Sequence, residues 1–112
     1  NTSSNASRCV SKNTGAYSAS KAGVTNLTKW AALEMIGYGI RVNAFGPGTS
    51  VTRMTEGTRN DPARNELFLN NMPIGRYGKP EEAAAVALFL GSDEASFMVG
   101  ETVVEDGGFT LF

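Results

Sequence analysis

The 112-residue sequence contains no histidine and only one cysteine, Cys9. Without histidine, Ser-His-Asp and Cys-His nucleophiles and histidine metal sites are excluded. A single cysteine cannot form an internal disulfide or a thiolate cluster, and Cys9 has no histidine to act as its activating base. Any chemistry in this chain therefore depends on hydroxyls, carboxylates, amines and backbone groups, and we expect no metal site.

A strong charge of either sign and a long apolar run are also absent. The 10 basic and 11 acidic residues are scattered and give a net charge of −1, so neither a nucleic-acid nor a membrane partner is indicated. The longest apolar run, residues 83–90, is too short to span a bilayer. The first ten residues lack the apolar centre of a signal peptide. We expect a single cytoplasmic domain, for which a hydrophobic content of 41% is sufficient.

The segment Tyr17-Ser18-Ala19-Ser20-Lys21 is the strongest candidate for chemistry. In a helix, residues four apart lie on the same face, so the phenol and the amine point the same way. A free tyrosine has a pKa of about 10, and a cation within about 4–6 Å lowers that pKa. Tyr17 could then exchange a proton with a carbonyl or alcohol oxygen. The alternative reading is a surface tyrosine beneath a solvated lysine.

A long amphipathic helix is predicted over residues 16–35. Val24, Leu27 and Ala31 recur at helical spacing and form an apolar stripe, which neighbouring alanines and a tryptophan widen. So broad a stripe suggests burial on two sides, one of them against a sheet. Two glycines that follow the segment are expected to end the helix.

Further loops, strands and helices are predicted along the rest of the chain. They are a polar surface loop, a strand, an irregular segment with a short helix, an apolar core helix and a last strand, at residues 5–15, 40–45, 54–77, 79–91 and 102–104. Asp61-Pro62 and Lys79-Pro80 are helix-start signals. The acidic pair that follows Pro80 is read as helix-start charge, not as paired catalytic carboxylates. Strands separated by long helices predict an α/β fold with a parallel sheet.

Two candidate site features, a serine and a glycine-proline turn, fall at the ends of predicted strands. Ser4 follows the first residues of the chain, and the turn Gly46-Pro47-Gly48 follows the strand over residues 40–45. In parallel sheets, ligands bind beyond the carboxyl ends of the strands. We therefore expect Ser4 and this turn to share a site.

Five motifs, taken in this order, resemble the short-chain dehydrogenase/reductase family, in its large group with a Ser...Tyr-x-x-x-Lys active site. The resemblance spans essentially the whole chain, and the Gly-Pro-Gly variant is similar to glucose-dehydrogenase-like or 3-oxoacyl-reductase-like members. The five motifs are Ser4, Tyr17 to Lys21, Arg41 to Gly48, Gly75 to Glu82, and Glu105 to Gly108.

The resemblance implies roles for individual residues. Tyr17 would be the general acid/base, Lys21 would assist it and hold the nicotinamide ribose, and Ser4 would bind the substrate oxygen. The stretch after the second strand would lie over the nicotinamide, and most relatives carry Val or Ile where this chain has serine. The residues implied to bind cofactor are Tyr17, Lys21, Pro47, Gly48, Ser50 and Thr52.

By the resemblance, residues 1–112 form one domain, the C-terminal portion of a longer dinucleotide-binding enzyme with a doubly wound, Rossmann-like fold and a substrate lid at about residues 49–77. The implied reaction is hydride transfer between NAD or NADP and a small carbonyl or secondary alcohol. A homo-oligomer, dimer or tetramer, is implied as well. The glycine-rich phosphate loop of the family is missing, so we expect the isolated chain to bind cofactor weakly or not at all.

Two other interpretations stay open at this point. A non-catalytic remnant or interaction module would keep the same fold and tolerate loss of the Tyr17 hydroxyl. A nucleotide-sugar epimerase or dehydratase also uses Tyr-x-x-x-Lys, although the Pro-Gly-x-x-x-Thr turn and the Asp-Gly-Gly ending fit the short-chain family better.

Overall fold

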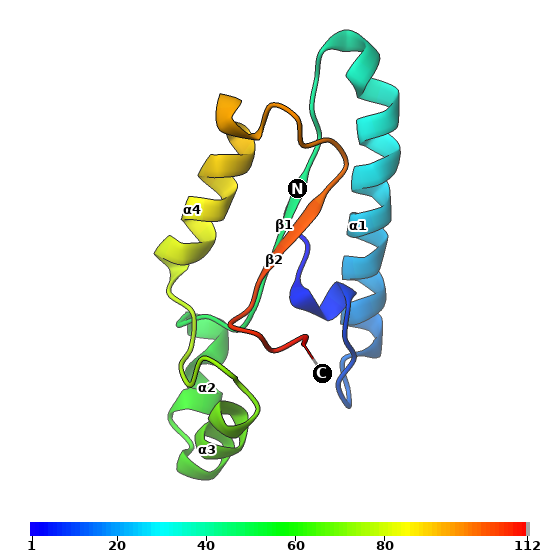
Figure 1. The fold of residues 1–112 in the computed structure, drawn as a ribbon. Helices are drawn as coiled ribbons and strands as arrows, with labels where there is room; N and C mark the ends of the chain where they lie inside the picture. Colours follow the sequence, from blue (N-terminus) through cyan, green and yellow to red (C-terminus); the bar gives the residue numbers. More distant parts are fainter. Residues whose placement is uncertain (112) are drawn as a thin grey trace.

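The computed structural model describes residues 1–111, in which one long helix precedes the first labelled strand and three helices separate it from the second. In Figure 1, helices α1 and α4 lie on opposite sides of two strands, and α2 and α3 lie beyond the carboxyl ends of those strands. This arrangement confirms the predicted α/β class. The elements are α1 (Gly15–Met35), β1 (Ala44–Pro47), α2 (Glu56–Arg59), α3 (Pro62–Asn70), α4 (Pro80–Gly91) and β2 (Thr102–Glu105), with 3-10 helices at Asn5–Ser7, Ile36–Tyr38, Arg53–Thr55 and Asp93–Ala95.

The sheet is parallel, as predicted. Strand β1 pairs with β2 in a register that sets Ala44 opposite Thr102. Residues 1–4, called the first strand from here on, extend the sheet on the other side of β1, where the Ser3 N–H donates to the Phe45 carbonyl at 2.8 Å. A parallel bridge joins Thr2 to Phe45. The chain thus runs strand, long helix, strand, which brings Ser4 and the end of β1 to the same edge.

The predicted strand over residues 40–45 is wrong at its start, because β1 begins at Ala44. The residues before it serve as side-chain anchors. The Arg41 guanidinium donates to the carbonyls of Leu90, Ser92 and Ala95 at 3.2, 2.9 and 2.8 Å, at the end of α4 and just after it. Asn43 donates to the Met98 carbonyl at 2.8 Å and accepts from the Glu101 N–H at 3.0 Å.

Helix α1 begins and ends close to the predicted limits, but its buried face differs from the predicted apolar stripe. Leu27 and Trp30 are 54% and 58% exposed, whereas Thr28 and Ala32 are buried. The contact with the first strand is polar, since the Thr28 hydroxyl accepts from the Asn1 side-chain amide at 2.9 Å. Short hydroxyl side chains let the helix approach the chain start closely, and within residues 1–111 Leu27 and Trp30 stay more than half exposed.

The helix-start signals are confirmed. The Asp61 carboxylate accepts from the N–H groups of Ala63 and Arg64, both at 3.1 Å, and Pro62 is the first residue of α3. Helix α4 begins at Pro80. The predicted surface loop over residues 5–15 is partly wrong, because a 3-10 helix occupies Asn5–Ser7 and Asn5 is buried. The polar composition of these residues therefore predicted an exposed loop where the structure has a 3-10 helix.

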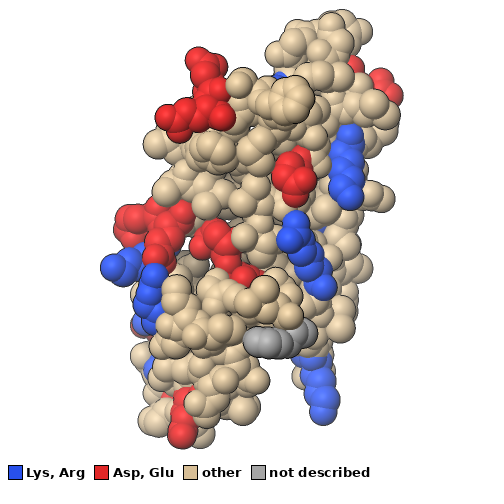
Figure 2. All heavy atoms as spheres, in the orientation of Figure 1, with Lys and Arg blue, Asp and Glu red and all other residues tan. Residues whose placement is uncertain are grey.

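The apolar character of the helices and the distribution of surface charge follow from the composition of the sequence. None of the helices within residues 1–111 has the length and apolar character needed to cross a bilayer. Figure 2 shows basic and acidic side chains dispersed over the face that it presents, without a large patch of one sign.

Candidate active site

A cavity of about 740 Å³ lies beyond the carboxyl ends of the strands. Its wall combines the loop after the first strand, the start of α1, the turn after β1, helix α3 and the C-terminal segment. Six of the seven residues predicted for the site line it: Ser4, Tyr17, Pro47, Gly48, Ser50 and Thr52. The structure therefore brings together residues that are up to 48 positions apart in the sequence.

Lys21, the seventh residue, lies beside the cavity and not in its wall. Its ammonium nitrogen is 5.8 Å from the centroid of the Tyr17 ring, one helical turn away. The same ammonium donates to the Thr2 carbonyl at 3.2 Å, which ties α1 to the first strand. The spacing of Tyr17 and Lys21 thus predicted their proximity correctly.

Ser4 is buried at the end of the first strand. Its hydroxyl accepts from the Ala6 N–H at 3.1 Å and donates to the Asn5 side-chain oxygen at 3.3 Å. The second bond is long for a hydroxyl donor, so it can be exchanged for a better acceptor. Gly46 lies directly against this residue, because a Cβ at Gly46 would be 3.2 Å from the Ser4 carbonyl carbon.

The stretch after β1 forms the wall opposite Tyr17. Main-chain bonds fix it to the segment before α4, with the Val51 N–H donating to Gly78 at 2.9 Å. The Ser50 carbonyl accepts from the Thr55 hydroxyl at 2.8 Å, while the Ser50 N–H has no acceptor within residues 1–111. A free N–H that borders a cavity can bind a carboxamide oxygen. Serine at position 50, in place of the expected Val or Ile, therefore leaves the main-chain N–H available.

Cys9 also lines the cavity, and the sequence did not assign it there. Its thiol lies 3.5 Å from the Asn5 carbonyl. Burial raises the pKa of the Cys9 thiol, and the negative charge of Asp106 raises it further. The side chain therefore stays a neutral thiol at physiological pH and acts as part of the wall, not as a nucleophile.

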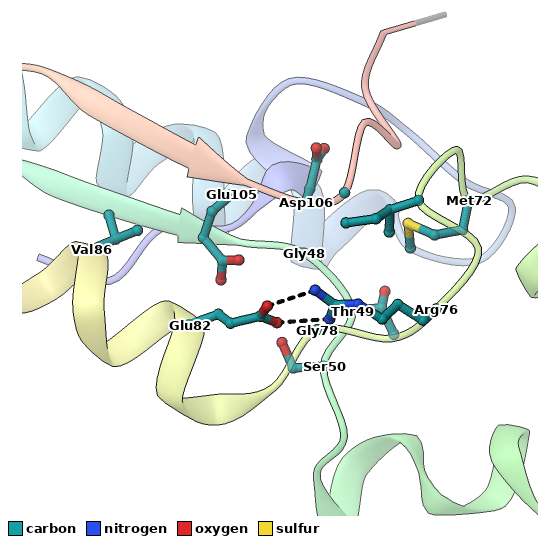
Figure 3. Close-up of a pocket in the computed structure, with 12 residues that line it drawn as sticks. Gly48, Thr49, Ser50, Met72, Arg76, Gly78, Glu82, Val86, Glu105 and Asp106 are labelled. Atoms are coloured by element: carbon teal, nitrogen blue, oxygen red, sulfur yellow. Dashed lines mark hydrogen bonds and ion pairs between the residues drawn. The ribbon is translucent and has the colours of Figure 1, made fainter.

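A smaller cavity, of about 200 Å³, lies on the other side of Gly48 and Ser50. Figure 3 shows the Glu82 and Glu105 carboxylates pointing into it, with Arg76 paired to Glu82. The two guanidinium–carboxylate distances are 2.6 and 2.9 Å. Hydrogen bonds from Arg76 and then from the Lys79 N–H lower the pKa of Glu82 to about 2. Burial, together with the charges of Glu82 and Asp106, raises the pKa of Glu105.

The contacts of Glu82 extend the interpretation of the acidic pair after Pro80 as helix-start charge. Glu82 does cap the start of α4, since its carboxylate accepts from the Lys79 N–H at 2.7 Å. It also binds Arg76, which the sequence did not predict, because the two residues are six positions apart on either side of a turn. Neither helical nor strand spacing predicts a contact between two such residues.

Comparisons with known proteins agree with this geometry. A family described as Enoyl-(Acyl carrier protein) reductase matches residues 1–110. The 3-oxoacyl-(acyl-carrier-protein) reductase FabG of Thermotoga maritima is 48% identical over 95 residues, which cover 85% of this chain and 38% of that protein.

Solved structures give the same result. A protein described as a 2-deoxy-D-gluconate 3-dehydrogenase of Agrobacterium tumefaciens, with bound NADP, is 39% identical in sequence, and its structure matches with a TM-score of 0.94. The match covers 100% of this chain and 46% of that protein's chain. A 4-hydroxyisoleucine dehydrogenase complexed with NADH is 32% identical with a TM-score of 0.96 and the same two coverages. The predicted doubly wound, Rossmann-like fold is thereby confirmed. The chain spans less than half the length of each of these relatives.

Proposed function

The chain belongs to the short-chain dehydrogenase/reductase family, and on this premise we propose that it carries the proton-transfer site of an NAD(P)-dependent oxidoreductase. In this proposal, residues 1–112 are the C-terminal portion of a longer enzyme that acts on a small carbonyl or secondary alcohol. The single observation that carries it is the cavity that Ser4, Tyr17 and the 47–52 stretch line together.

A nicotinamide ring fits the residues present. The volume of about 740 Å³ lies within the usual range of ligand pockets, roughly 300–1,000 Å³. Pro47, Gly48 and Thr52 would hold the ring, and the Ser50 N–H would donate to its carboxamide. When bound, NAD or NADP accepts or supplies the hydride.

The chain's own side chains would handle the proton. In the reducing direction the Tyr17 hydroxyl donates its proton to the carbonyl oxygen, and in the oxidising direction the phenolate accepts it. The Lys21 ammonium, 5.8 Å from the ring centroid, stabilises the phenolate by its charge. The Ser4 hydroxyl exchanges its 3.3 Å bond to Asn5 for a bond to the substrate oxygen, which holds that oxygen near Tyr17.

Assembly and location belong to the same proposal. Leu27, Trp30 and Leu33 are exposed apolar residues of α1, and they support a homo-oligomer in which a second copy covers this helix. The cytoplasmic location that the sequence predicts stays a prediction.

The test is Tyr17→Phe in the full-length protein, with Tyr38→Phe as the matched control. Tyr38 lies just after α1, is 78% exposed and does not line the cavity. We expect Tyr17→Phe to lower kcat by at least about 100-fold, because an acid/base group typically contributes that much or more. Affinity for NADH or NADPH, followed by nicotinamide fluorescence, should change little. Near-normal turnover in Tyr17→Phe would remove Tyr17 from the reaction, and absence of turnover in the unsubstituted protein would favour a non-catalytic module.

A further inference from the structure

The cavity at Tyr17 continues into a second one, of about 530 Å³, between the loop after the first strand and helix α3. The two cavities share Cys9, Ser11, Phe68 and Phe109 as lining residues. Phe68 and Phe109 stack with their ring centroids 6.1 Å apart, so they form one continuous aromatic surface between the cavities. A ligand that reaches Tyr17 can therefore extend past these rings toward α3.

The outer cavity presents apolar side chains to a ligand. Val10 and Leu67 lie on its two sides and are 84% and 67% exposed, although both are aliphatic. Of the polar side chains beside them, Asn71 and Arg64 have partners in the protein, whereas the Ser11 and Thr58 hydroxyls, which also line this cavity, have no acceptor within residues 1–111. The Asn71 amide donates to the Leu67 carbonyl at 2.8 Å, and the Arg64 guanidinium pairs with Asp61 at 3.3 Å.

The inner cavity also has an apolar side, and some of its polar side chains bond within the protein. On the side toward α3, its wall is Met54, Phe68 and Phe109. The Thr14 and Thr55 hydroxyls donate inside the protein, to the carbonyls of Ser11 and Ser50, both at 2.8 Å. Hydroxyls without such an acceptor within residues 1–111 are those of Tyr17 and Ser11 and three in the 49–52 stretch, the wall proposed above for the nicotinamide.

A polyol would need a donor or acceptor for each of its hydroxyls, and a buried hydroxyl without one is costly. An alkyl chain needs only an apolar surface to cover it. We infer that the substrate is a ketone or secondary alcohol with an apolar tail, which extends from Tyr17 past Phe68 and Phe109 into the cavity between Val10 and Leu67. This inference rests on the proposed function and specifies the substrate class of the same site.

The test measures kcat/KM of the full-length protein for 2-butanone, 2-hexanone, 2-octanone and 2-decanone, and, in the oxidising direction, for 2-octanol, galactitol and D-glucose. Burial of one methylene contributes enough free energy for an increase of about fourfold. We therefore expect kcat/KM to rise about 16-fold for each two carbons, until the tail fills the outer cavity. We expect 2-octanol to be a better substrate than either polyhydroxylated compound.

Leu67→Asp places a charge on the outer cavity wall at an exposed position. It should lower the ratio of kcat/KM for 2-decanone over 2-butanone by about tenfold, because the tail would then lie against a carboxylate. Ala63→Asp is the matched control: it adds the same charge to α3 at an exposed residue that lines neither cavity, and should leave the ratio unchanged.

Three outcomes would overturn the inference. Ketone turnover that does not depend on chain length would refute it while the oxidoreductase proposal stood. A preference for galactitol or D-glucose would do the same. If no carbonyl or alcohol were turned over with either cofactor, both the proposed function and this inference would fail.

Discussion

Gly48→Ala is the substitution for which the structure gives the sharpest steric prediction. A Cβ at Gly48 would lie 2.5 Å from the Asp106 Cα and 2.6 Å from the Asp106 Cβ, whereas ordinary contacts begin at 3.4 Å. The methyl group is therefore too close by roughly 1 Å, a misfit that core overpacking data associate with a loss of about 1–3 kcal/mol.

The turn at Asp106 cannot move away freely. Its carboxylate accepts from the N–H groups of Gly108 and Thr110 at 3.0 and 3.1 Å, and the Gly48 N–H donates to the Glu105 carbonyl at 2.8 Å. A shift of β1 relative to this turn would break at least one of these bonds. Because Gly48 also lines the Tyr17 cavity, the same shift should weaken the cofactor binding that is proposed above for this cavity.

The assay is thermal unfolding of the full-length protein by circular dichroism. A loss of 1–3 kcal/mol corresponds to a lower Tm by roughly 2–12 °C in a protein of 150–250 residues. Gly57→Ala is the control, because a Cβ at Gly57 meets nothing within 4 Å. Since Gly57 lies in α2, where alanine is favoured over glycine by up to about 1 kcal/mol, its Tm should stay the same or rise by up to about 4 °C. A Tm that is likewise not lowered in Gly48→Ala would refute the described packing of this turn.

Two further predictions concern charged side chains. The pKa of Glu105 is raised from 4.5 by burial, so its contribution to stability is fully present below the unfolded value and is lost as pH rises through the folded value. Glu105→Gln should therefore raise Tm more at pH 7.5 than at pH 4, and an equal change at both pH values would contradict this. Arg41→Ala removes three hydrogen bonds to carbonyls and should lower the free energy of unfolding in urea by at least about 2 kcal/mol. Arg64→Ala, which removes one exposed ion pair, should cost less than about 1 kcal/mol, and equal losses in the two variants would argue against the anchoring role of Arg41.

Local patterns predicted the parts of the site that lie within one helical turn or at one chain reversal. Tyr17 and Lys21 are on one face of α1 because the helix repeats every 3.6 residues. The starts of α3 and α4 follow from residues that cap a helix or fit its first turn, Asp61-Pro62 and Pro80. These features depend on neighbours in the sequence, so the sequence specifies them directly.

The buried face of α1 could not be predicted in the same way. Hydrophobicity selected Leu27, but the chain start approaches the side of α1 that carries Thr25 and Thr28, where the Ser3 and Asn1 side chains bond their hydroxyls. A helix buries the face that its neighbour reaches, and the position of that neighbour depends on the whole path of the chain. The larger apolar residues of α1 consequently stay exposed within residues 1–111.

The sequence by itself therefore determined the family, the α/β order of elements and the candidate residues Tyr17 and Lys21, because these depend on short motifs and on the order of those motifs along the chain. Only the tertiary structure joined Phe68 and Phe109 to the cavity of Tyr17 and set Arg76 against Glu82. Such contacts depend on where strands and turns bring distant segments together, and no local spacing encodes that distance. The shape of the cavity beside Tyr17 is accordingly a property of the fold, while the residue proposed for proton transfer can be read from the chain.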